Sequence, residues 1–393
     1  MAALASAPAP AGVQDRLWLE AIYGGKAVPP GQTAAAINGH PARLFYDTGV
    51  GAPIVLSEDY AKAIGLALAV AAPEHVKNPI PGKPEVGFSV PCELTYFGVS
   101  TKNLMVPVFA LPRAVPRADG IFEGMVGWPT MRGSLWSFAL ADGQFSQISA
   151  VPAAAKSWQQ FQIWDEDNTL SLIPPSDPRG VERIIVDTGN PSGVELPPDQ
   201  WKEWLAQHPN APMTLYMDYL PGQKIRLSYE SFAETFPLGT IVLHKVPVSE
   251  ADPTYYAVQA EPGEKIVAIG LAAFARMEVM LDPPNDTAYL RVSGSPAPPY
   301  LHNRMGAAYY PRSRANPDLI ATVVPNDPAA LAGIRDGDAL VRIDGQSTER
   351  WRNDAELLKR MGGRVPAGTR VVYTVRRGTE MIEVPVVARD ILK

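Results

Sequence analysis

The tripeptide Asp-Thr-Gly occurs twice in the chain and supplies its best candidates for acid–base chemistry. The two copies are Asp47-Thr48-Gly49 and Asp187-Thr188-Gly189. Each copy ends an apolar, strand-forming run and precedes Gly, Pro and small residues, so each carboxylate should lie where a strand turns a corner. Two carboxyl groups that lie close together share one proton, because ionising both is unfavourable, and such a pair can act as acid and base on one water molecule. A single copy would instead predict an ordinary turn aspartate.

The sequence around the two tripeptides repeats in the same order, which favours a functional pair over two unrelated turns. The stretch before each aspartate predicts two strands, joined ahead of Asp47 by a type I′ turn at Asn38-Gly39. A strand and a helix follow each tripeptide, and later Gly127 and Gly270 end matching apolar runs. The aspartates are 140 residues apart and these glycines 143 residues apart, so the chain contains one long internal repeat.

This order of elements resembles that of the aspartic peptidases of the retropepsin and pepsin group, over residues 30–292. The resemblance implies a mainly β, bilobal fold, with two β-barrel lobes related by a pseudo-twofold axis at residues 29–155 and 156–292. It implies that Asp47 and Asp187 are catalytic and activate the water that hydrolyses a peptide bond in a polypeptide substrate, without a covalent intermediate, a metal or a cofactor. Since one chain supplies both aspartates, a monomer is expected.

The same resemblance assigns positions to further residues. Those that support the aspartate pair are Thr48, Gly49, Thr188 and Gly189, and those of the cleft wall are Gly127, Trp128 and Gly270. A Gly/Pro-rich stretch at residues 78–88 is either the flap that closes over substrate or an ordinary surface loop, and residues 218–223 take the corresponding place in the second lobe. Trp201 and Trp204, at helical spacing, either line the cleft or pack in the core.

The sequence departs from the family at the residue after each tripeptide. The family usually has Ser or Ala there, whereas this chain has Val50 and Asn190. The hydroxyl that supports an aspartate is therefore missing after Asp47, while the amide of Asn190 could replace it in the second lobe. The interpretation as an enzyme thus has an alternative from another class, a catalytically inactive peptide-binding or scaffold protein with a protease-like fold.

A Ser/Gly/Pro-rich linker at residues 293–299 precedes a tail of different character. The run Ala-Gly-Ile-Arg-Asp-Gly-Asp at residues 332–338, followed by Ile-Asp-Gly, resembles a PDZ domain of the bacterial protease-associated type. The resemblance implies a small α+β domain at residues 300–393 that binds a peptide C-terminus as an added strand or regulates access to the cleft. Its carboxylate-binding amides would be those of Met305, Gly306, Ala307 and Ala308, although this segment could equally be an ordinary first strand.

Composition and charge exclude several other classes of function. The net charge of −6 disfavours nucleic-acid binding, although residues 297–393 are mildly basic. The sequence has no apolar run long enough to span a membrane. Cys92 is the only cysteine, so neither an internal disulfide nor a thiolate metal cluster can form. The five histidines show no metal-ligand spacing and predict no metal site; they are His40, His75, His208, His244 and His302.

Residues 1–28 predict an N-terminal arm outside the folded lobes. The Ala/Pro-rich beginning of this arm is either what remains of a removed signal peptide or simply a flexible segment. Together with the resemblance of the tail domain, it suggests a bacterial protein that is periplasmic or secreted, with the cytoplasm as the alternative.

Overall fold

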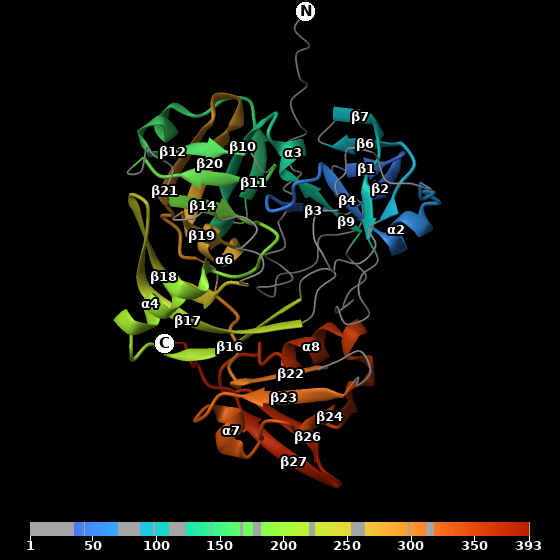
Figure 1. The fold of residues 1–393 in the computed structure, drawn as a ribbon, viewed down its shortest axis with the longest axis vertical. Helices are drawn as coiled ribbons and strands as arrows, with labels where there is room; N and C mark the ends of the chain where they lie inside the picture. The colour runs from blue at the N-terminus through green and yellow to red at the C-terminus, as the bar shows by residue number, and fades with distance from the viewer. Residues whose placement is uncertain are drawn as a thin grey trace, which may run out of the picture.

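Strands dominate the protein, as the sequence predicts (Figure 1). The computed structural model describes residues 35–42, 44–69, 87–96, 99–109, 123–142, 144–165, 168–175, 182–219, 225–252, 264–297, 299–311 and 318–392. The predicted arm at residues 1–28 and most of the predicted flap, residues 78–86, lie outside the described residues, as do residues 220–223 of its counterpart.

The first nine strands of the first repeat form two sheets. One has the order β2-β1-β6-β7, and the turn at Asn38-Gly39 has φ angles of 49° and 78°, which confirms the predicted type I′ hairpin. The other has the order β3-β9-β4-β8-β5, and Asp47 is the last residue of β3. The strands are β1 (Ala35–Ile37), β2 (His40–Ala42), β3 (Leu44–Asp47), β4 (Ile54–Ser57), β5 (Gly87–Phe88), β6 (Cys92–Tyr96), β7 (Val99–Leu104), β8 (Pro107–Phe109) and β9 (Gly124–Gly127).

The second repeat has the same strand order around its tripeptide, β14-β19-β15-β18-β17-β16. In both repeats, the strand before the aspartate pairs in parallel with the strand that leads to the later glycine, β3 with β9 and β14 with β19. The strand that leads to the glycine also pairs antiparallel with the strand after the tripeptide, β9 with β4 and β19 with β15. The strand after the tripeptide then pairs in parallel with one further strand, β4 with β8 and β15 with β18. The strands are β14 (Glu182–Val186), β15 (Val194–Leu196), β16 (Met213–Tyr219), β17 (Ile225–Leu238), β18 (Ile241–Glu250) and β19 (Lys265–Ile269).

Short helices occupy matching positions in the two repeats. After each tripeptide and its strand comes a helix, α2 (Glu58–Ala63) or α4 (Pro198–Gln207). After each later glycine comes a helix of one turn, α3 (Trp128–Met131) or α6 (Leu271–Phe274). The internal repeat of the sequence is therefore a repeat of strand and helix topology. Among the described residues, no helix has the length and apolar character required to cross a membrane.

The sheet of the second repeat continues beyond β14 and joins the two repeats. On that side of β14 its order is β13-β12-β21-β20-β10-β11, with β13 paired to β14, so the last strands of the first repeat pair with β20 of the second. Figure 1 shows β10 and β11 beside β12 and β20, on the other side of the molecule from β6 and β7. The strands are β10 (Leu135–Ala139), β11 (Gln144–Ile148), β12 (Gln159–Trp164), β13 (Ser171–Ile173), β20 (Met277–Asp282) and β21 (Thr287–Val292), with the 3-10 turns η1 (Leu140–Asp142), η2 (Ala153–Ser157) and η3 (Pro283–Asn285).

One hydrophobic core runs beneath both repeats. Its centre is an aromatic cluster in which Phe145 contacts Tyr46 and Trp136, with ring centroids 4.4 and 5.2 Å apart, and Phe138 contacts Phe274 across the repeats at 5.2 Å. Each buried aromatic side chain contributes roughly 1.5–3 kcal/mol of hydrophobic stabilisation. The core therefore holds the two repeats together beneath the tripeptide loops.

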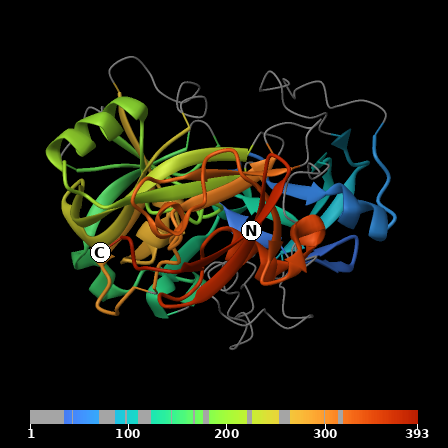
Figure 2. The same cartoon turned by 90° about the horizontal axis from the view of Figure 1, so that it is seen from below.

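The C-terminal part forms a separate sheet with its own core (Figures 1 and 2). The sheet has the order β22-β23-β24-β26-β27, with β25 paired to β24, and β22 is its edge strand. The elements are β22 (Ala307–Pro311), β23 (Leu319–Val323), α7 (Pro328–Ala332), β24 (Ala339–Ile343), β25 (Gln346–Ser347), η4 (Thr348–Asn353), α8 (Ala355–Met361), β26 (Arg370–Arg377) and β27 (Glu380–Val387). The mixture of sheet and helix agrees with the predicted α+β character; the exact domain limits stay predictions.

Candidate functional site

The two tripeptide loops face each other and bring Asp47 and Asp187 together. A Cβ atom added to Gly189 would lie 2.2 Å from Oδ2 of Asp47, and one added to Gly49 would lie 2.8 Å from Cγ of Asp187. Each carboxyl therefore packs against the glycine of the opposite loop, where a side chain of any size would collide with it. The two carboxyls also lie within hydrogen-bond reach of one another.

The threonines of the two tripeptides form crosswise hydrogen bonds beneath the aspartates. The amide of Thr48 donates to Oγ1 of Thr188 at 3.1 Å, and the amide of Thr188 donates to Oγ1 of Thr48 at 3.1 Å. The hydroxyls then donate to carbonyls of the preceding strands, Thr188 to Tyr46 at 2.7 Å and Thr48 to Val186. Both threonines are buried, so each group of the motif depends on a partner supplied by the other loop.

The residues that follow the later glycines make matching hydrogen bonds to the two loops. The amide of Trp128 donates to the Val50 carbonyl at 3.1 Å, and the amide of Leu271 donates to the Asn190 carbonyl at 2.7 Å. The Trp128 side chain is 0% exposed and belongs to the core. In this structure, therefore, the three residues predicted to form the cleft wall, Gly127, Trp128 and Gly270, lie buried under the loops.

Burial raises the pKa of Asp47 to about 6, because an apolar surrounding disfavours the charged carboxylate. The Asp187 side chain and the amides of Gly49 and Gly189 act in the opposite direction by hydrogen bonding to it. The Gly49 amide donates to Oδ1 of Asp47 at 3.0 Å, and the Gly189 amide donates to Oδ1 of Asp187 at the same distance. The pair can thus hold one proton at mildly acidic pH, which is the state that acid–base chemistry on a water molecule requires.

The residues after the tripeptides contact the aspartates through the backbone: the amides of Val50 and Asn190 donate to the carbonyls of Asp47 and Asp187, at 3.1 and 3.2 Å. Oδ1 of Asn190 accepts a hydrogen bond from the Ser192 amide at 2.9 Å, so this side-chain oxygen stabilises its own loop. Trp201 and Trp204 stack on each other with ring centroids 5.4 Å apart and are buried in the core, which confirms the core interpretation of this pair.

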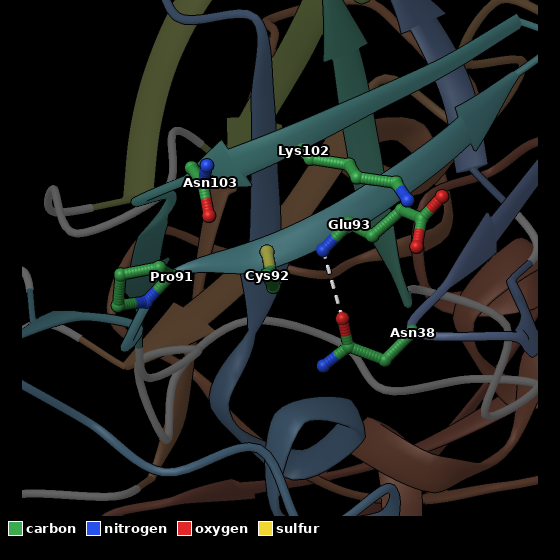
Figure 3. Close-up of a pocket in the computed structure, with 6 residues that line it drawn as sticks. All are labelled: Asn38, Pro91, Cys92, Glu93, Lys102 and Asn103. Atoms are coloured by element: carbon green, nitrogen blue, oxygen red, sulfur yellow. Dashed lines mark hydrogen bonds between the residues drawn. The ribbon is translucent and has the colours of Figure 1, made fainter.

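An open pocket of about 220 Å³ lies on the sheet that contains β1, β6 and β7 (Figure 3). Cys92 lines it, but this thiol donates to the Leu104 carbonyl at 3.2 Å, and burial raises the pKa of the thiol. The pocket contains no residue of either tripeptide; its lining is Asn38, Pro91, Cys92, Glu93, Lys102 and Asn103. Among the described residues, no group of three or more His, Cys, Asp or Glu side chains is placed to hold a metal ion.

The predicted carboxylate-binding segment of the tail domain lies at the start of β22. Gly306 has a φ of 67°, and the amides of Met305 and Gly306 both donate to Oδ1 of Asn303 at 3.0 Å. The side chains of Met305, Ala307 and Ala308 are buried. Sequence reasoning missed Asn303; its position two residues before Met305 is a local signal for such a turn, since Asn bonds amides ahead of it.

Comparison with known families identifies part of this tail. Residues 319–377 match the PDZ domain, a stretch that runs from the first residue of β23 to the last residue of β26. The C-terminal sheet therefore contains a PDZ domain, as predicted. No curated protein matches the chain.

Proposed function

We propose that the protein is an aspartic endopeptidase whose PDZ domain binds peptide segments and regulates access to the cleft. The observation that carries the proposal is the aspartate pair itself: each carboxyl packs against the glycine of the opposite tripeptide, above crosswise threonine hydrogen bonds. A chance pair of turns would not repeat the same strand pairings and the same supporting amides on both sides. The predicted monomeric state and the periplasmic or secreted location stay predictions.

In this mechanism the two aspartates have different roles. Asp47 carries the shared proton, because burial raises its pKa. In the proposal the other member of the pair, Asp187, acts as the base. Asp187 removes a proton from a water molecule as the water oxygen attacks the peptide carbonyl carbon, and Asp47 donates its proton to the carbonyl oxygen. When the tetrahedral intermediate collapses, the C–N bond breaks, the amine leaves with the proton held by Asp187, and Asp47 recovers its own. No acyl-enzyme forms.

The PDZ domain supplies the second part of the proposal. PDZ domains bind an extended peptide along a sheet edge through main-chain hydrogen bonds. In this chain the edge strand of the C-terminal sheet is β22. A substrate that is bound there by its tail would be held near the aspartates at a high effective concentration.

The test is cleavage of an unfolded protein from acid to neutral pH. Wild type should cut it, and Asp47→Asn and Asp187→Asn should each abolish cutting while remaining folded by circular dichroism. Asp142→Asn, at an exposed aspartate of η1, is the matched control and should cut like wild type. A folded wild type that cuts nothing, or aspartate variants that cut as well as wild type, would instead support the alternative of a peptide-binding protein without turnover.

A further inference from the structure

The hairpin formed by β16 and β17 lies against the PDZ domain. Figure 1 shows both strands between the second repeat and β22, and residues of β16 and β17 approach β22 directly. Met217 of β16 packs against the core of the PDZ domain, although every other residue of this core and its edge lies in the C-terminal part of the chain. This is the side of β22 opposite to β23, where an added peptide strand would lie.

Asn303 links the hairpin to the predicted carboxylate-binding segment through hydrogen bonds. Its backbone carbonyl accepts a hydrogen bond from the Thr214 hydroxyl of β16 at 2.9 Å, and its backbone amide donates to Glu230 of β17. Its side chain accepts from the amides of Met305 and Gly306, at 3.0 Å each. The acceptor position that a peptide carboxylate would need at these two amides is therefore filled, and the residue that fills it is held by the hairpin.

The second contact between the hairpin and the tail is a buried carboxyl. Glu230 is 2% exposed and accepts a hydrogen bond from the Tyr300 hydroxyl at 2.7 Å. The positive charge of Arg364, which follows α8, also stabilises it. Moving the hairpin away from the PDZ domain would separate the Glu230 carboxyl from these partners. Specific hydrogen bonds and charge therefore stabilise the docked arrangement.

The far side of the carboxylate-binding segment is closed as well. The Arg304 amide donates to the Gly363 carbonyl at 3.0 Å, and a Cβ atom on Gly363 would lie 2.2 Å from Oδ1 of Asn303. The Asn303 side chain is thus enclosed between the start of β22 and the turn after α8. A peptide terminus can reach the two amides only if Asn303 and the strands that hold it move.

We infer that the β16–β17 hairpin is an internal occupant of the PDZ domain, so that a peptide binds along β22 only after this hairpin has been released. The inference rests on the proposed peptide binding by the PDZ domain. It extends that proposal because the hairpin belongs to the sheet in which β14 and β19 carry the second aspartate loop. Release of the hairpin would therefore affect both peptide binding along β22 and the sheet that carries Asp187.

Hydrogen exchange in the full chain tests the docking without any assumption about cleavage. Removing the hairpin contacts in a Thr214→Val, Met217→Ala double variant should speed amide exchange at residues 303–309 by about tenfold or more, because local opening becomes easier. Met381→Ala, at an exposed methionine of β27, is the matched control and should leave these amides unchanged. Amides of β26 report whether the PDZ domain stays folded. Unchanged exchange at residues 303–309 in the folded double variant would overturn the docking.

Binding of a defined peptide tests the occupancy. The probe is a fluorescent peptide with the sequence of residues 212–219, Pro-Met-Thr-Leu-Tyr-Met-Asp-Tyr, which copies β16. It should bind the double variant at least about tenfold more tightly than wild type, since the internal strand no longer competes. Equal binding to both proteins, or none to the variant, would overturn the inference. Neither result depends on the aspartates, so failure of the proposed peptidase activity would be seen separately.

Discussion

At the scale of single residues, the proposed chemistry depends on which aspartate holds the proton. Burial raises the pKa of Asp47 from 3.8 to about 6, so its acidic form persists to higher pH than that of an exposed aspartate. The proposed acid works only when protonated. We therefore expect kcat/KM for cleavage of an unfolded protein to fall about tenfold per pH unit above pH 6. Activity that still rises between pH 6 and 8 would contradict this assignment.

The crosswise threonines predict a second effect, on stability. Thr188→Val removes a hydroxyl that accepts from the Thr48 amide and donates to the Tyr46 carbonyl, and it leaves both groups buried. Each unsatisfied buried group costs about 1–3 kcal/mol, so the free energy of unfolding should fall by about 3 kcal/mol in urea titrations. Thr188→Ser keeps the hydroxyl and is the control. Equal losses in the two variants would contradict the prediction, because the hydrogen bonds that valine removes would then contribute no more than the methyl group that serine lacks.

At the scale of elements, helix α8 offers a test of the PDZ domain. Asp354 caps this helix through a hydrogen bond from the Leu357 amide at 3.0 Å, and Gln346 donates to its other oxygen at 3.0 Å. Asp354→Ala should destabilise the helix by about 1 kcal/mol, measured as faster exchange of its first amides. Asp354→Asn keeps an acceptor for the Leu357 amide and loses only the exposed hydrogen bond from Gln346, so the first amides of α8 should exchange as in wild type. If the alanine variant also exchanges like wild type, the cap does not limit opening of α8.

Local elements could be predicted from the sequence, and long-range partners could not. The turn at Asn38-Gly39 follows from two residues that tolerate positive φ, and the strand before Asp47 follows from its apolar run. By contrast, nothing near Trp136 indicates that β10 crosses to pair with β20, because the partner strand lies more than a hundred residues later. The contacts of Asn303 with the hairpin could not be predicted for the same reason, although its turn has a local signal: its partners on β16 and β17 become neighbours only when the hairpin docks.

At the scale of the whole molecule, burial shifts the pKa of two groups beside Asn303, the residue that contacts both the hairpin and the predicted carboxylate-binding segment. Burial raises the pKa of Glu230 from 4.5 to about 7, and it lowers the pKa of His302 from 6.5 to about 4. The two shifts have opposite effects on stability. The native chain holds the Glu230 proton more tightly than the unfolded chain does, so the free energy of unfolding falls as pH rises from about 4.5 to 7. The native chain holds the His302 proton less tightly, so the free energy of unfolding rises as pH rises from about 4 to 6.5.

A comparison with Glu230→Gln isolates the carboxyl from the histidine, because His302 titrates in both proteins. Gln keeps the shape and an acceptor for the Tyr300 hydroxyl but carries no charge at any pH. Relative to wild type, the variant should gain about 3 kcal/mol of unfolding free energy between pH 4.5 and pH 8, the range over which wild-type Glu230 loses its proton in the native chain. Urea titrations of both proteins at these two pH values give the difference. If it does not change with pH, Glu230 is not buried as a carboxylic acid, and the hairpin and the PDZ domain do not enclose it in solution.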